Sequence, residues 1–349
     1  MSAVLTGTHF LSLDFLQFLK RTRLPAAPLS ADKKHEDDVN FRKFCRQLFH
    51  SSLAHILGSL KPWMTKVRII RCADGHFRRV IFGLGPYIAN YPEQALLACI
   101  VSGWCAKCTA NAKNLDADIS AILCSHEHTE SVRVLAGDDL NILWDGYGIV
   151  GDIIPFTAYF PHTDIHELLS PDLLHQIIKG TFKDHLVAWV GDYLQLVHGE
   201  AGAKVILADI DRRISATPSF PGLRRFPEGW GFKQWTGDDS KALMKVYLPA
   251  ISGHVPQQMV CALSAFLKFC YLVRQFELTE DTLAAIDTAL DRFHVEREIF
   301  ITSGVQKDFL LPRQHSLKHY RRLIQEFGAP NSLCSSITES KHIKAVKEP

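Results

Sequence analysis

Cys105 and Cys108, separated by two residues, form the clearest metal-ligand pattern in the sequence. Two thiolates at this spacing can bind one zinc ion, provided that two further nitrogen or sulfur ligands complete a tetrahedron. Cys124, His126 and His128 follow sixteen to twenty residues beyond Cys108, and His128 is the candidate that we carry forward. A lone CxxC pair also occurs in ordinary buried turns, so zinc binding and a plain turn both stay open.

Asp172 and His175 form a second pair that can do chemistry, at the expected start of a long helix. Residues three apart on a helix share a face, so Asp172 can orient His175 or share a cation with it. In the alternative interpretation, Asp172 compensates the positive end of the helix dipole and His175 is a half-buried histidine. The residue types alone favour this second interpretation.

Basic side chains gather in two parts of the sequence. One pair of arginines precedes the aromatic and basic residues 232–235, a cluster that can stack on or grip a nucleic acid strand. The other group lies in the C-terminal run 311–345, where basic side chains along helices suit phosphate contacts. The candidate DNA contacts are Arg224, Arg225, Lys318, Arg321 and Arg322. A solvated helix face and a core with its rim are the plainer explanations of these clusters.

The composition is that of a globular protein. With 39 Lys and Arg against 37 Asp and Glu, the net charge of +2 predicts neither a nucleic acid nor a membrane partner, so any DNA-binding surface must be local. The longest apolar stretch, residues 95–105, is about half of what a bilayer crossing needs, and we expect no membrane segment. Nine scattered cysteines without a framework spacing do not predict disulfides.

Hydrophobic periodicity predicts the elements that position these residues. We expect a helix over residues 41–60, two strands over 67–71 and 79–84 joined by a turn at 73–75, and a strand just before the CxxC pair. Beyond about residue 138 the pattern is predominantly helical, with a helix start at residues 170–172 where Ser170 can cap free amides. Further helices are expected over residues 240–248, 255–275, 280–300 and 316–327.

Long segments of the sequence resemble one protein family. They include GLGPYIANYPEQALLACIVSGWCAKC at 83–108, LWDGYGIVGDIIPFTAYFPHTDIHELLSPDLLHQIIKGTFKDHLVAWV at 143–190, and residues 210–251 and 311–349. These segments resemble the Plavaka transposases of mushroom-forming fungi, which are related to the CACTA-type transposases. The resemblance runs in order and almost without gaps from about residue 30 to the last residue.

The resemblance implies a DDE transposase of RNase H-like fold that acts on transposon-end DNA in the nucleus. Three carboxylates then bind two Mg²⁺ or Mn²⁺ ions, which activate the attacking oxygen and stabilise the leaving one. The second acid of the family corresponds to Asn90, and the third to Glu339. The first acid belongs to an upstream segment that residues 1–30 do not resemble. The DxxH motif of related transposases corresponds to Asp172 and His175.

The expected fold is therefore α+β: an RNase H-like remnant with a small sheet and a large helical insertion. We expect an irregular leader at 1–30, the remnant with its CxxC at 31–137, the helical insertion at 138–310, and a basic C-terminal helix with the last acid at 311–349. An amide is a poor ligand for a hard cation, so Asn90, the missing first acid and the cut-back termini together predict a truncated, catalytically inactive copy. The alternatives are a zinc-stabilised DNA-binding or interaction protein, and a residual Mg²⁺-dependent phosphodiesterase that uses Glu339.

Overall fold

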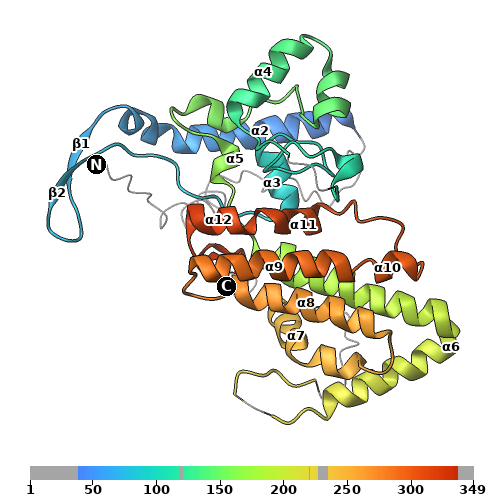
Figure 1. Ribbon diagram of the computed structural model, residues 1–349. Helices are drawn as coiled ribbons and strands as arrows, with labels where there is room; N and C mark the ends of the chain where they lie inside the picture. The colour runs from blue at the N-terminus through green and yellow to red at the C-terminus, as the bar shows by residue number, and fades with distance from the viewer. Residues whose placement is uncertain (1–37, 118–120, 220, 227–234, 337–349) are drawn as a thin grey trace. The chain divides into compact units, whose positions relative to one another are not determined.

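A computed structural model describes residues 38–117, 121–219, 221–226 and 235–336 (Figure 1). The chain forms two compact units, Met1–Ser170 and Pro171–Pro349. The described residues are mostly helical and contain one two-stranded antiparallel sheet, which agrees with the expected α+β class. None of the described helices combines the length and the apolar character that a bilayer crossing requires.

The first unit opens with helix α2 (Val39–Leu57) and the 3₁₀ turns of η2 (Gly58–Met64). Asp38 caps α2, because its carboxylate accepts hydrogen bonds from the amides of Asn40 and Phe41. The inner face of α2 contributes Leu53 to a core that Leu97 and Phe156 also line. The predicted helix over residues 41–60 is thus confirmed.

Strands β1 (Arg68–Arg71) and β2 (Phe77–Val80) form an antiparallel hairpin, as the sequence predicts. Arg68 pairs with Val80 and Arg71 with Phe77, so β2 begins two residues and ends four residues earlier than expected. Gly75 has a φ of 82°, a conformation that glycine adopts without strain. The turn is therefore a true reversal of the chain.

The segment before the CxxC pair is not a strand, and this expectation was wrong. Residues 91–97 form helix α3 (Tyr91–Leu97), which Asn90 caps and in which proline stands in the first turn. These start signals outweigh the apolar run that follows. After α3 the chain turns through Cys99, at a φ of 51°, and reaches the cysteines as a loop. The rest of this unit contains η3 (Ala112–Asn114), α4 (His126–Ala136), η4 (Ile142–Gly146), η5 (Phe156–Tyr159) and α5 (Ile165–Leu168).

The described elements of the second unit are all helices, joined by turns and loops. It begins with η6 (Leu173–Val187), a wide π-type helix that continues into α6 (Ala188–Ser215). Asp172 caps η6, whereas Ser170, the expected cap, donates its hydroxyl to the carbonyl of Tyr87. The following elements are α7 (Gly237–Ile251), α8 (Gln257–Val273), α9 (Glu280–Glu296), α10 (Ile299–Thr302), α11 (Pro312–His315), η7 (Ser316–His319), α12 (Tyr320–Phe327) and η8 (Pro330–Leu333).

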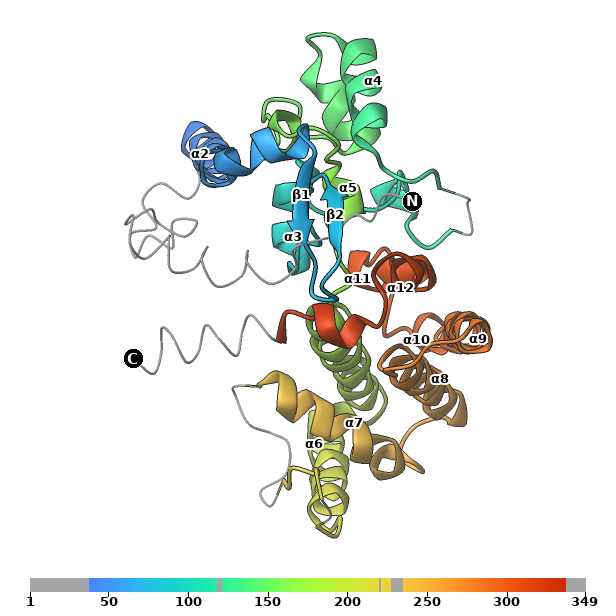
Figure 2. The ribbon, with the colours of Figure 1, turned by 90° about the vertical axis from the view of Figure 1, so that its left-hand side faces the viewer.

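Aromatic side chains fill the core of the second unit. Phe182 of η6 meets Tyr247 of α7 edge-on at 6.0 Å between ring centroids, and Phe266 of α8 lies 5.1 Å from Phe293 of α9. Helices α8 and α9 run side by side in both views (Figures 1 and 2). The strong helical periodicity of residues 240–300 therefore corresponds to a real buried face.

Candidate metal centre

The CxxC turn of the first unit holds both thiols in a buried, fixed position. Cys105 is 8% exposed and Cys108 is 3% exposed. The Lys107 amide donates a hydrogen bond to the Cys105 sulfur at 3.3 Å. The turn is anchored from outside, because the Cys124 amide donates to the Lys107 carbonyl at 3.0 Å and Leu123 forms a β-bridge with Cys108.

His166 fixes the same turn from another side. Its Nδ1 donates to the Ala106 carbonyl at 2.8 Å, and the Lys107 ammonium donates back to the His166 carbonyl at 2.5 Å. The two thiols lie so close that a hydrogen bond with Cys108, together with burial, raises the pKa of Cys105 well above its ordinary value. These hydrogen bonds to the backbone of residues 106 and 107 thus hold the two sulfur atoms side by side.

A pair of histidines stands in the second unit, where α11 gives way to η7. His315 ends α11 and His319 ends η7, so they occupy positions i and i+4 and face the same side. Their ring centroids lie 5.3 Å apart at an angle of 74°. The buried neighbours Leu317 and Tyr320 fix the segment against the core of this unit.

Gln314 links the histidine segment to a polar network inside the second unit. Its Oε1 accepts from the buried guanidinium of Arg297 at 2.6 Å, and its amide lies 3.3 Å from Nδ1 of His185. Arg297 also lies over the Phe309 ring, 4.2 Å from its centroid. The segment therefore has little freedom to rotate about its axis.

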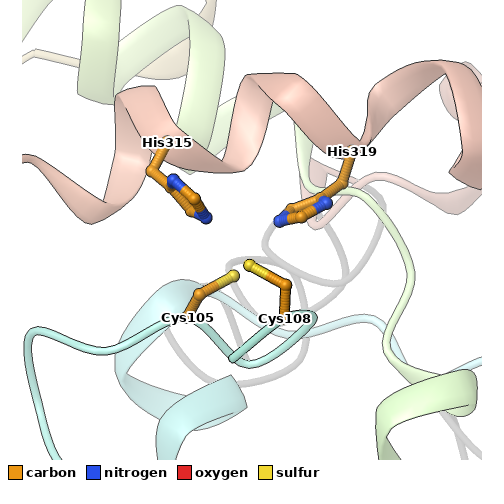
Figure 3. A group of neighbouring side chains, drawn as sticks. All are labelled: Cys105, Cys108, His315 and His319. Carbon is orange, nitrogen blue, oxygen red and sulfur yellow. The ribbon is translucent and has the colours of Figure 1, made fainter. Parts of the chain in front are cut away.

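One ligand atom from each of Cys105, Cys108, His315 and His319 lies within 4.8 Å of the other three. Figure 3 shows the two sulfur atoms and the two imidazole rings pointing toward one another. Three of the four side chains are buried, and His319 is half-buried. No other group of three or more His, Cys, Asp or Glu side chains comes together in this way within the described ranges.

The donor set and its spacing fit zinc. Zn–S and Zn–N bonds of about 2.0–2.3 Å place the ligands of a tetrahedron roughly 3.3–3.8 Å apart. Two sulfur and two imidazole donors suit zinc, whereas Mg²⁺ requires oxygen ligands. Four protein ligands leave no open position for water, which is the pattern of a structural site.

Residues 20–190 match the family model described as Plavaka transposase. This part of the chain belongs to the Plavaka transposase family. The match includes Asn90, the CxxC turn and the Asp172–His175 pair, but it ends before the two histidines at 315 and 319. A search of curated proteins gave no match.

Asn90, expected at the second acid of the Plavaka family, has a structural task in this chain. Its Oδ1 accepts a hydrogen bond from the Glu93 amide at 3.1 Å and so caps helix α3. Asparagine and aspartate are both good caps at such a position, so the change from acid to amide leaves the helix start intact. Glu339, expected at the third acid, lies outside the described residues.

Asp172 and His175 form a buried hydrogen-bonded hub. Asp172 is 0% exposed, and its carboxylate lies 2.8 Å from Nδ1 of His175. The same carboxylate accepts from the Leu174 amide at 3.2 Å and from the Ser335 hydroxyl at 2.6 Å. These contacts join the start of η6 to residues 334–335. Asp172 therefore caps η6, as the structural interpretation predicts, and its contact with Nδ1 also orients the His175 ring.

The remaining zinc candidate from the sequence, His128, is not part of the cysteine–histidine group. Its amide donates to the Ser125 hydroxyl at the start of α4, and its ring packs against Tyr147 at 6.4 Å between centroids. Cys124 lies beside Cys108 but contributes its backbone, and burial raises the pKa of its thiol to about 12, with Cys108 adding to the shift. The signal that could have found the second half is the HxxxH spacing of His315 and His319.

Most of the candidate DNA contacts are engaged in ion pairs. Arg321 pairs with Asp287 and Glu280, Arg322 pairs with Glu326, and Arg224 pairs with the buried Asp239. Arg225 is exposed, Lys318 is half-buried, and residues 232–234 of the aromatic cluster lie outside the described residues. These three arginines already pair with carboxylates, which would compete with a DNA phosphate for the guanidinium groups.

Proposed function

We propose that this chain is a transposase-derived, DNA-binding protein of the nucleus, stabilised by one structural zinc ion and unable to cleave DNA. The family match over residues 20–190 supports the transposase ancestry, and with it the RNase H-like origin and the DNA partner. The observation that carries the zinc assignment is the convergence of Cys105, Cys108, His315 and His319 to within 4.8 Å.

The zinc assignment gives the two buried thiols a role as metal ligands. Two protonated thiols and two imidazoles would be an ordinary polar group, but all four are good ligands once metal binding displaces the thiol protons into solvent. A structural zinc ion adds folding free energy directly, and its ligands need no mobility. The rigid anchoring of the CxxC turn and of the α11–η7 segment suits such a role.

The absence of cleavage is proposed from the amide at Asn90. Two cations about 4 Å apart repel each other, and transposase sites hold them by concentrating carboxylate charge. An amide at one acid position removes a full negative charge from such a site. Asn90 instead serves as a helix cap, which is a sufficient structural reason for its presence.

Metal analysis of the purified full chain tests the zinc assignment. We expect about one zinc ion per chain, and strong loss of zinc in Cys108→Ser and in His319→Ala. His128→Ala is the matched control, because it removes a histidine that the structure places outside the group, and it should retain the metal. A chain that keeps its zinc after His319→Ala, or that loses it after His128→Ala, would exclude the four-ligand site.

Incubation with transposon-end DNA in Mg²⁺ or Mn²⁺ tests the second half of the proposal. We expect no metal-dependent cleavage by the unmodified chain, and none after Asn90→Asp alone. Cleavage that Glu339→Gln abolishes would instead establish the residual phosphodiesterase. This assay is independent of the zinc analysis, so each part of the proposal can fail alone.

A further inference from the structure

The β1–β2 hairpin carries a local excess of positive charge that the whole-chain balance hides. Residues 66–80 contain five Lys and Arg side chains and a single carboxylate, Asp74, whereas the complete chain has a net charge of only +2. The hairpin forms a two-stranded finger at the edge of its unit (Figures 1 and 2). Its charge is therefore presented on a small, accessible element.

The hairpin arginines divide by face into partnered and unpartnered pairs. Arg68 lies over the Trp63 ring, 3.6 Å from its centroid, and Arg78 forms a two-pronged ion pair with Asp74. That pair holds the pKa of Asp74 down at about 2, through the Arg78 hydrogen bond first. Arg68 and Arg78 share one face and have structural tasks in the hairpin itself.

The opposite face presents two further arginines on one diagonal and two apolar side chains on the other. Residues directly opposite in an antiparallel pair share a face, and Ile69 pairs with Arg79 while Arg71 pairs with Phe77. Ile69 is 71% exposed and Phe77 is 72% exposed, and both arginines are exposed as well. Within the described part of the chain, neither Arg71 nor Arg79 makes an ion pair.

We propose that this face, made of Ile69, Arg71, Phe77 and Arg79, is a docking surface for duplex DNA. Exposed guanidinium groups without a protein carboxylate are suited to phosphate oxygens, which supply most of the affinity of DNA-binding proteins. A two-stranded ribbon with strands roughly 5 Å apart fits a major groove about 12 Å wide. Ile69 and Phe77 then lie against sugars and base edges, each beside one of the two arginine contacts.

The choice of DNA over another acidic partner rests on the proposed function, because residues 20–190 match a transposase family. The surface is distinct from the arginines that the sequence singled out, most of which are already paired with carboxylates. It also needs no metal ion. The hairpin proposal can therefore fail while the zinc assignment stands.

Binding of a fluorescein-labelled duplex, measured by anisotropy across a salt series, tests the proposal. We expect Arg71→Gln/Arg79→Gln to lower affinity about tenfold or more at low salt, and to reduce the slope of log K against log salt by about 2, one unit for each lost phosphate contact. Arg71→Lys/Arg79→Lys keeps both charges and should keep the slope. All four substitutions lie on exposed side chains, so the circular dichroism spectrum should not change.

The matched control is Arg42→Gln/Lys268→Gln, which removes the same charge from two exposed side chains elsewhere. It should keep the wild-type slope. Equal affinity of the wild-type chain and the Arg71→Gln/Arg79→Gln variant overturns the hairpin surface but leaves DNA binding intact. A control that loses as much affinity as the variant has the same meaning. A wild-type chain that does not bind the duplex at all overturns both this surface and the DNA partner in the proposed function.

Discussion

Asn90 caps helix α3 at the position where the resemblance to the Plavaka family predicts a metal-binding acid. Its carbonyl oxygen completes the hydrogen bonding of the first turn of α3, a task that depends on shape and on one acceptor. Cation binding depends on charge, which the amide lacks. The two requirements separate at this position, and substitutions can test them one at a time.

Substitution of Asn90 should affect stability only when the acceptor is lost. Asn90→Ala removes the cap and should lower the free energy of unfolding by about 1 kcal/mol, whereas Asn90→Asp keeps an equivalent acceptor and should change it by less than about 0.5 kcal/mol. Urea unfolding of the three chains at neutral pH measures the difference. A large destabilisation by Asn90→Asp would show that a negative charge is not tolerated there.

His50 should make the first unit sensitive to acid. It is fully buried, its Nε2 donates to the Leu96 carbonyl at 3.0 Å, and its Nδ1 accepts from the Phe156 amide at 3.2 Å, so the ring is held neutral. Burial lowers its pKa to about 4. The unfolded chain therefore binds the extra proton between about pH 6.5 and 4, and the stability that is present above pH 6.5 is lost as the pH falls through this window.

The size of this effect follows from the two pKa values. Between pH 7 and pH 5, His50 should account for about 2 kcal/mol of lost unfolding free energy. His50→Gln retains hydrogen-bonding capacity without the titration, so the variant should lose correspondingly less over the same interval. Urea titrations at both pH values provide the comparison, and an unchanged pH dependence in the variant would assign the acid sensitivity to other groups.

At the scale of elements, hydrophobic periodicity and turn residues were enough to predict most of the helices and the hairpin. Helices α8 and α9 were predictable because their apolar positions repeat at the helical period, and the hairpin because a glycine turn separates two β-branched runs. The strand before the CxxC pair was wrong because an apolar run cannot by itself distinguish helix from strand, and the Asn90–Pro92 start signal decides for helix. Local signals act at short range, so they identify elements better than their contacts.

The candidate site was only half predictable for the same reason. Cys105 and Cys108 are conspicuous through their spacing, but His315 and His319 lie about 200 residues further along the chain, and an HxxxH pair on a helix is common without a metal. Nothing local connects the two pairs. His128 was preferred because it is near in sequence, whereas the structure uses its backbone to begin α4.

The hub at the start of η6 should be structural. Asp172→Ala would leave the Leu174 amide, the Ser335 hydroxyl and the His175 ring without their shared acceptor, and should lower the free energy of unfolding by at least about 2 kcal/mol. The zinc content of this variant should equal that of the unmodified chain. Loss of zinc in soluble, folded Asp172→Asn would instead support the metal-adjacent interpretation of the DxxH pair.

For the whole molecule, zinc should act as a cross-link between remote parts of the sequence. Its ligands lie about 200 residues apart in the sequence, so the unfolded chain does not hold the site together and the binding free energy of zinc adds to the stability of the folded chain. A strong chelator should therefore lower the midpoint of thermal unfolding of the unmodified chain. The His319→Ala variant should already unfold at this lower temperature, and adding chelator should not change its midpoint further. A chelator effect that survives in His319→Ala would point to a different metal site.

The distance between the two ligand pairs also sets a timetable for the growing chain. Cys108 leaves the ribosome about 200 residues before His315, which at about 5–20 residues per second corresponds to roughly 10–40 s. During that interval the thiol pair exists without its imidazole partners, exposed to oxidants and to competing thiophilic metals. Under the zinc proposal, the metal site can therefore be completed only after residues 315–319 have been synthesised.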